Sequence, residues 1–126
     1  MCRKETMTIA PVSVPRYREE HDAAFGPAMI EHRTAESGLS QLGSYFMAFQ
    51  SDELSDPWTV LYEETIYVIE GRARIVVLEE GGEHTVTGEV GDLIVLPKGS
   101  TVRYGATAGT RLLLSISPVN WRDAEA

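Results

Sequence analysis

The stretch that decides the fold is residues 56–71, DPWTVLYEETIYVIEG, with the segment that follows it, RARIVVLEE at residues 72–80. Both segments are rich in β-branched and aromatic residues, and the single Gly71 separates them. Such runs, bounded by glycine and acidic residues, are typical of short antiparallel strands joined by tight turns. From Gly43 onward the chain keeps this spacing and shows no sustained 3.6-residue period, so we predict an all-β sandwich or barrel.

One hairpin within this region is predicted in detail. Residues 80–83 read EGGE, and two glycines supply the positive φ angles of a primed turn. Ahead of Gly43 the pattern is less regular: residues 16–25, RYREEHDAAF, suit one or two helical turns, and residues 27–34, PAMIEHRT, suit an edge strand. We therefore divide a single domain into an N-terminal extension at 1–42, a barrel at 43–121 and a C-terminal tail at 122–126.

Composition limits the classes of function. The chain has 126 residues, 43% hydrophobic and 24% charged, as expected of one ordinary globular domain. Its 19 acidic and 11 basic residues give a net charge of -8, which disfavours nucleic acid and anionic membranes as partners. The single cysteine, Cys2, allows no intrachain disulfide, and no apolar run approaches the roughly 18 residues of a membrane span. We expect a cytoplasmic protein.

Two segments, YVIEGRARI at 67–75 and GDLIVLPKGS at 91–100, resemble the signature motifs of the cupin superfamily. The first motif runs His-x-His, three or four residues, Glu, six residues, Gly. The second runs Gly, five residues, Pro-x-Gly, two residues, His. Glu64 and Gly71 fit the first motif, and Gly91, Pro97 and Gly99 fit the second. The resemblance implies a small antiparallel jelly-roll β-barrel.

The metal-binding histidines of these motifs are replaced. Under the two allowed spacings, the first pair falls on Trp58 and Val60 or on Pro57 and Thr59, and the third histidine falls on Val102. Of the usual three histidines and one glutamate, only Glu64 remains. We therefore predict no metal cofactor, and keep as an alternative a divalent metal in a variant site.

A longer pattern is similar to the cupin domain of the ethanolamine utilization protein EutQ family, over about residues 44–121. The shared features are a Trp-Thr-x-x-Tyr-x-Glu segment, a Pro-Lys-Gly-Ser turn and a closing Pro-x-Asn-Trp. They correspond here to residues 58–64, 97–100 and 118–121. The acetate kinase activity ascribed to that family is not expected here, because the sequence has no Gly-rich phosphate loop or Walker lysine.

The alternation of side chains along the strands predicts the site. Side chains of a strand alternate between faces, so Trp58, Val60 and Tyr62 share the face of Glu64, and Val102 shares that of Tyr104. If Glu64 points inward, the barrel holds one carboxylate, two phenols and an indole. This is the lining of a small-molecule pocket. The predicted catalytic residues are Glu64, Tyr62 and Tyr104, and the predicted ligand-binding residues are Trp58, Val60, Val102 and Arg111, the last for a carboxylate substrate.

The histidines have separate expectations. We expect His84 to be exposed at its hairpin. His21 and His32 lie in the N-terminal extension, so they could reach the site only if that extension closed over the barrel mouth.

Three functions are compatible with the sequence. The first is a metal-independent cupin that binds a small polar or anionic molecule, with Glu64 as a general acid or base. The second is an enzyme with a variant metal site built from Glu64, Tyr62 or Tyr104 and a histidine such as His32. The third is a structural or regulatory subunit without a ligand. Because small cupins commonly pair through sheet edges, we also expect a homodimer.

Overall fold

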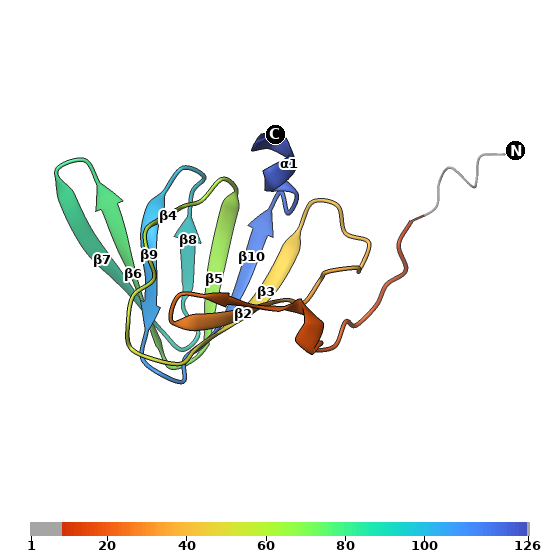
Figure 1. Ribbon diagram of the computed structural model, residues 1–126, viewed down its shortest axis with the longest axis horizontal. Helices are drawn as coiled ribbons and strands as arrows, with labels where there is room; N and C mark the ends of the chain where they lie inside the picture. Colours follow the sequence, from red (N-terminus) through yellow and green to blue (C-terminus); the bar gives the residue numbers. More distant parts are fainter. Residues whose placement is uncertain (1–8, 126) are drawn as a thin grey trace, which may run out of the picture.

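Two antiparallel sheets face each other in the computed structural model, which describes residues 9–125 (Figure 1). The six-stranded sheet has the order β1-β2-β3-β10-β5-β8, and the four-stranded sheet has the order β4-β9-β6-β7. The strands are β1 Asp22–Phe25, β2 Ala28–His32, β3 Gly43–Phe49, β4 Trp58–Thr59, β5 Glu63–Glu70, β6 Arg72–Glu79, β7 Gly82–Glu89, β8 Leu93–Leu96, β9 Thr101–Ala106 and β10 Arg111–Ser117. The predicted all-β jelly-roll class is confirmed.

Alternation along the central strands builds the core between the sheets. On β5, Ile66 and Val68 are fully buried, and on β10 Leu112 is fully buried. The register pairs Val68 with Leu112, so their side chains meet on the inner face. The predicted hairpin at residues 80–83 is also confirmed, since Glu79 pairs with Gly82 across a turn in which Gly81 has a φ of 91°.

Gly71 has a steric role in the turn from β5 to β6. Its φ is 85°, a left-handed conformation that side chains disfavour. A Cβ atom there would collide with the side chain and backbone of Thr110, which is fully buried. Thr110 accepts a hydrogen bond of 3.0 Å from the amide of Arg72. The glycine of the first motif therefore allows close packing of this turn against the chain before β10.

Residues 58–70, read from the sequence as one strand, form two strands in different sheets. Trp58 of β4 pairs with Val102 of β9 in the four-stranded sheet, whereas β5 pairs with β10 and β8. The chain crosses between the sheets at Val60, whose amide donates to the carbonyl of Ser100 at 2.9 Å. The inward direction of alternate residues survives the crossing, since Val60, Tyr62 and Glu64 are all buried.

The N-terminal segment is more regular than the sequence indicated. Of residues 16–25, predicted as helical, only Glu19–His21 forms a helical turn, of 3-10 type, and Asp22–Phe25 forms strand β1. Strand β2 is internal rather than the predicted edge strand, because β1 pairs with one side of it and β3 with the other. The reversal at Gly26, with a φ of 57°, lets β1 fold back and complete that ladder.

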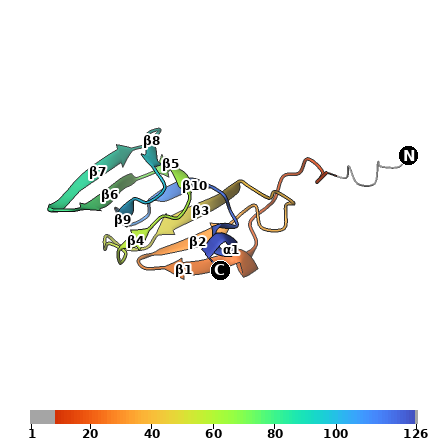
Figure 2. The same ribbon diagram turned by 90° about the horizontal axis from the view of Figure 1, so that it is seen from above.

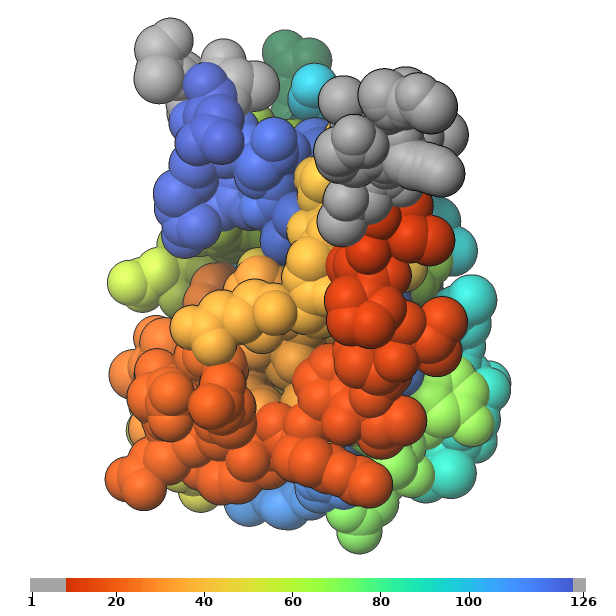
Figure 3. Space-filling view, turned by 90° about the vertical axis from the view of Figure 1, so that its right-hand side faces the viewer, coloured from red at the N-terminus to blue at the C-terminus, as the bar shows by residue number. Residues whose placement is uncertain are grey.

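The C-terminal tail forms a short helix, α1 Trp121–Glu125. This helix lies above the β1–β2 hairpin in Figure 1, so the two overlap in Figure 2, which is seen from above. In Figure 3 the C-terminal segment, in blue, lies above the orange β1–β2 hairpin on the same side of the molecule. Among the described residues, no helix is long and apolar enough to cross a membrane. The two terminal elements thus approach the same region of the barrel.

Candidate functional site

A pocket of about 360 Å³ lies where the β1–β2 hairpin and α1 meet the inner face of the barrel. We call it the aromatic pocket, because five aromatic rings line it in addition to two histidines. Its lining residues are His21, Ala23, Ala24, Phe25, Ile30, His32, Tyr45, Trp58, Tyr62, Glu64, Leu114, Ile116, Trp121 and Arg122. The volume suits a small molecule.

Glu64 is the most deeply buried ionisable side chain that lines the aromatic pocket, with 2% of its surface exposed. It points inward from β5, where it pairs with Leu96 on one side and Ile116 on the other. The Tyr104 hydroxyl donates a hydrogen bond of 2.8 Å to Oε1. Within the described part of the chain, Oε2 has no hydrogen-bond partner. One carboxylate oxygen is thus held by a hydrogen bond, and the other is buried without one.

Burial sets the protonation of this carboxyl. Desolvation raises the pKa of Glu64 to about 7, and the hydrogen bond from Tyr104 offsets part of that rise. Burial also raises the pKa of Tyr62 to about 12, and burial followed by the charge of Glu64 raises the pKa of Tyr104 further. Both phenols are therefore neutral at physiological pH, while Glu64 exchanges its proton near neutrality.

Tyr62 and Trp58 are linked at the pocket wall. The Trp58 indole Nε1 donates a hydrogen bond of 2.9 Å to the Tyr62 hydroxyl. Trp121 of α1 packs against both side chains, with ring centroids 6.0 Å from Trp58 and 5.4 Å from Tyr62. Phe25 of β1 adds edge contacts to Trp58 and Tyr104 at 5.6 and 5.5 Å. The rings fix one another in edge-to-face and tilted arrangements.

The N-terminal segment does close over the barrel mouth, which brings His21 and His32 into the pocket lining. His32 stacks on Tyr45 with centroids 4.3 Å apart, and burial lowers its pKa, so the ring is neutral near pH 7. Sequence reasoning assigned no pocket role to Phe25, Tyr45 or Trp121. The closing Pro-x-Asn-Trp segment was the only signal that marked one of them, Trp121.

Three of the predicted ligand-binding residues do not line the aromatic pocket. Arg111 occupies an outward position of β10, where Leu112 points inward, and its guanidinium lies 3.7 Å from Glu70 with 46% of the side chain exposed. Val60 and Val102 are fully buried core residues. Tyr104, predicted as catalytic, is also buried outside the lining, and it contacts two lining residues, Glu64 through a hydrogen bond and Phe25 through an edge contact.

The residues present do not fit the metal of typical cupin sites. The first pair of histidine positions carries Trp58 and Val60 or Pro57 and Thr59, according to the spacing, and the third carries Val102. None of these side chains is a good ligand for a transition-metal ion. No group of three or more His, Cys, Asp or Glu side chains within residues 9–125 is arranged to hold a metal. Glu64 is instead engaged by a phenol, so its chemistry is that of a buried carboxyl.

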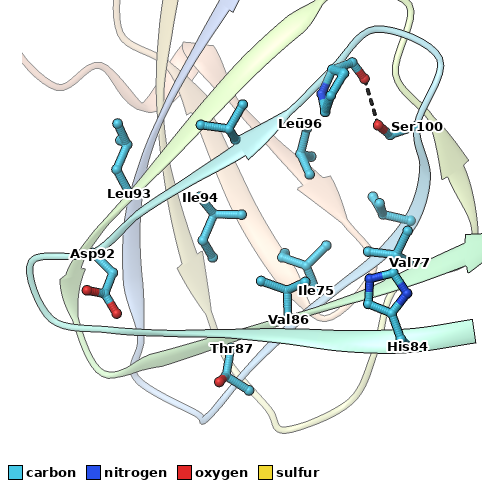
Figure 4. A pocket seen from close by; sticks show the side chains of 13 residues that line it. Ile75, Val77, His84, Val86, Thr87, Asp92, Leu93, Ile94, Leu96 and Ser100 are labelled. Carbon is cyan, nitrogen blue, oxygen red and sulfur yellow. Dashed lines mark hydrogen bonds between the residues drawn. The ribbon is translucent and has the colours of Figure 1, made fainter.

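A second hollow, which we call the aliphatic groove, lies between β7 and β8, at the edges of the two sheets (Figure 4). It measures about 510 Å³ and is lined by Ile75, Val77, His84, Val86, Thr87, Asp92, Leu93, Ile94, Val95, Leu96, Pro97, Ser100 and Val102. His84 is exposed, as its place in the hairpin predicted, and lies 3.5 Å from Glu79. The Ser100 hydroxyl donates to the Pro97 carbonyl at 2.7 Å. None of the buried lining residues is ionisable.

Comparison with known proteins assigns the family. The family model described as "Ethanolamine utilisation protein EutQ" matches residues 29–123. The chain belongs to the EutQ family. This stretch includes most of β2, all of β3 to β10 and most of α1, and so most of the aromatic pocket. The predicted EutQ-like cupin assignment is confirmed.

Curated EutQ relatives are longer than this chain. The protein named acetate kinase EutQ from Escherichia coli K12 is 33% identical over 89 residues, which cover 71% of this chain and 35% of the relative. The protein of the same name from Salmonella typhimurium LT2 is 35% identical over 83 residues, which cover 66% and 34%. The chain thus spans about a third of the length of these relatives.

Solved structures give the same fold. The Clostridium difficile EutQ protein has a TM-score of 0.64 and 25% identity, covering 84% of this chain and 82% of that one. Bacillus subtilis oxalate decarboxylase at pH 4.6 has a TM-score of 0.70 at 22% identity, covering 87% of this chain and 30% of that one. The second likeness establishes the cupin fold alone.

Proposed function

We propose that this EutQ-family chain is a metal-independent cupin that binds a small molecule in the aromatic pocket and exchanges a proton with it through Glu64. The observation that carries the proposal is the state of that carboxyl: it is buried beside the pocket, Tyr104 holds Oε1, and Oε2 has no hydrogen-bond partner among the described residues. A buried carboxyl with a pKa of about 7 is present in both protonation states near neutral pH. That property suits a general acid or base.

The surrounding residues have distinct roles in this proposal. Tyr104 is a positioning residue, since its hydroxyl holds Oε1 of the Glu64 carboxyl and leaves Oε2 without a partner among the described residues. Tyr62 lines the pocket and keeps its phenolic proton, so it can donate one hydrogen bond to a ligand. Trp58 and Trp121 form walls that exclude water from the carboxyl.

The acetate kinase activity in the name of the curated relatives is outside this proposal. The matched region is about a third of those proteins, and it contains no Gly-rich loop of the kind that cradles phosphates. A proton-exchange site is what these residues support.

The test uses the protein's own fluorescence. The chain has two tryptophans, and both line the aromatic pocket, so a bound molecule should alter their emission. Small amines, carboxylates, alcohols and sugars are titrated at pH 7. Calorimetry in buffers of different ionisation enthalpy then measures the protons taken up or released on binding. We expect saturable binding of one class, with proton exchange that Glu64→Gln abolishes and Glu63→Gln, the outward neighbour, retains.

Two results would contradict the proposal. One is that no class alters the emission in a saturable way. The other is that Glu64→Gln binds with the same proton exchange as wild type, while circular dichroism shows both to be folded. If a reaction is found, Glu64→Gln should lower turnover by roughly two orders of magnitude or more.

The homodimer and the cytoplasmic location stay predictions. The sequence argument for a dimer relied on residues 27–34 as an edge strand, and β1 now covers that strand. Sedimentation at micromolar concentration tests the dimer, and a single species near the monomer mass of 13.9 kDa would contradict it.

A further inference from the structure

Two donors at the aromatic pocket are already used, and the buried side-chain atom that has no partner among the described residues is an acceptor, Oε2 of Glu64. The Trp58 N–H is committed to the Tyr62 hydroxyl, and the Tyr104 O–H is committed to Glu64 Oε1. The Tyr62 hydroxyl accepts the bond from Trp58 and keeps its own proton to donate, whereas Oε2 of Glu64 has no partner among the described residues. A ligand that satisfies the ionised Glu64 must therefore bring a hydrogen-bond donor to Oε2.

The walls of the pocket favour positive charge on such a ligand. Five rings line it, from Phe25, Tyr45, Trp58, Tyr62 and Trp121. Indole and phenol faces carry negative electrostatic potential and attract organic cations. Trp121 already shows this preference, since the Arg122 guanidinium lies 4.3 Å from its ring centroid.

The charged groups around the pocket also favour a cationic ligand. Glu64 is buried, so its interaction with a ligand is weakly screened, whereas Arg122 is exposed at the mouth and its field is screened by solvent and salt. Burial keeps His32 neutral near pH 7. His21 lies 3.9 Å from Glu36, whose carboxylate offsets any charge on that imidazole. The net charge of -8 also attracts cations to the protein.

We propose that the aromatic pocket binds a small organic ammonium ion, whose N–H groups donate to Glu64 Oε2 and whose carbon atoms lie against the aromatic rings. This inference rests on the proposed function, since it assumes that the pocket binds a small molecule. It replaces the sequence-based expectation of a polar or anionic ligand with one chemical class. A pocket of about 360 Å³ has room for such a molecule.

A series of matched probes tests the class. Propylamine, 1-propanol and propionate share a three-carbon chain and differ in the head group, which at pH 8 is a cation, a neutral hydroxyl and an anion. Each is titrated at constant ionic strength while the emission of Trp58 and Trp121 is recorded. We expect propylammonium to bind about tenfold or more tightly than 1-propanol, because a hydrogen bond to a charged group is worth more than one between neutral groups. Propionate should bind most weakly.

Variants assign the effect to the buried carboxyl. Glu64→Gln should lower the affinity for propylammonium about tenfold or more and leave that for 1-propanol within about twofold. Glu63→Gln removes the same charge one residue away, on the exposed face of β5, and should leave all three affinities unchanged.

The failures of the two proposals can be told apart. Saturable binding of propionate or 1-propanol with equal or higher affinity than propylammonium would overturn the ammonium class and preserve the pocket as a ligand site. Equal losses in Glu63→Gln and Glu64→Gln would also overturn the class, by showing that net charge alone attracts the probe. Absence of saturation by all three probes, together with a failed metabolite screen, would overturn both.

Discussion

The aromatic pocket and the aliphatic groove occupy the same small barrel, yet their side chains come from different parts of the chain. All 13 residues of the groove lie between residues 75 and 102, within β6 to β9 and their turns. Eight of the 14 residues of the pocket come from the β1–β2 hairpin, the turn before it and α1. The terminal elements therefore supply most of the surface that could recognise a ligand.

The difference also shows that volume is a poor guide to function. The groove is the larger hollow, at about 510 Å³ against about 360 Å³, but its buried side chains are aliphatic. The pocket places a carboxyl of raised pKa among aromatic rings. We expect substitutions in the groove to change stability and substitutions in the pocket to change binding and pH dependence.

The largest expected effect is in the groove. Ile75 is fully buried and lines it, so Ile75→Ala should lower the free energy of unfolding by about 2–5 kcal/mol, the usual cost of such a cavity. Urea denaturation measures this loss, and the propylamine titration of the folded variant should match wild type. A loss below about 1 kcal/mol, or a lower affinity for propylamine, would contradict the assignment of a structural role to the groove and a binding role to the pocket.

The next effect concerns the pH dependence of stability. Burial raises the pKa of Glu64 to about 7 in the folded protein, so the unfolded chain, with a lower pKa, releases this proton first as the pH rises. The contribution of Glu64 to stability is therefore full below about pH 4.5 and is lost by about pH 7. Between pH 5 and 8 the loss amounts to about 2–3 kcal/mol.

Glu64→Gln should remove that component. Urea denaturation at pH 5 and pH 8 gives the change in free energy of unfolding for each protein, and the wild-type change should exceed that of the variant by about 2–3 kcal/mol. Glu63→Gln serves as the control and should show the wild-type change in free energy of unfolding between pH 5 and pH 8. An equal change in wild type and Glu64→Gln would show that Glu64 titrates at its ordinary pKa.

A smaller effect is expected for the positioning residue. In the native protein the hydrogen bond from Tyr104 to Glu64 Oε1 lowers the pKa of that carboxyl, and Tyr104→Phe removes this bond. The pKa of Glu64 should therefore rise above about 7, and the protein should lose about 1–3 kcal/mol at pH 8. Carbon-13 NMR of glutamate carboxyls, assigned with Glu64→Gln, follows the titration. A constant or lowered pKa would remove Tyr104 from its positioning role.

The last prediction is that treatment with a metal chelator has no effect. Because the motif positions that hold histidines in typical cupins lack them here, dialysis against a chelator should change neither the melting temperature nor the affinity for propylamine. Elemental analysis should find less than one tightly held transition metal per chain. Stoichiometric zinc, iron or manganese that survives chelation would show a metal site in the chain after all.

The barrel could be predicted from sequence because its signals are local. Gly71, the EGGE turn and the alternation from Trp58 to Glu64 each depend on a few neighbouring residues. The inward direction of Tyr62 and Glu64 was predicted correctly even though the chain crosses between sheets at Val60. The alternation of inward and outward side chains continues through the crossing, so the inward positions of Tyr62 and Glu64 could be predicted from the sequence.

The rest of the pocket depends on pairings that no local pattern encodes. Strand β1 has four residues, too few for an alternating pattern, and it is fixed by its ladder with β2. Trp121 lies on a five-residue helix and reaches Trp58 across 63 positions of sequence. Arg111 was misplaced for a related reason: its charge suggested a carboxylate ligand, but its position in β10 points it outward.

The arrangement of the aromatic pocket has a consequence for protein engineering. The turn before β1, the β1–β2 hairpin and α1 contribute His21, Phe25, His32 and Trp121, and the one buried core residue that these elements supply is Ala28 of β2. Selectivity can therefore be altered with the buried core left as it is. A library confined to His21, Phe25, His32 and Trp121 would vary what the pocket recognises without changing Ala28 or the rest of the buried core, so the domain offers a scaffold with an exchangeable recognition surface.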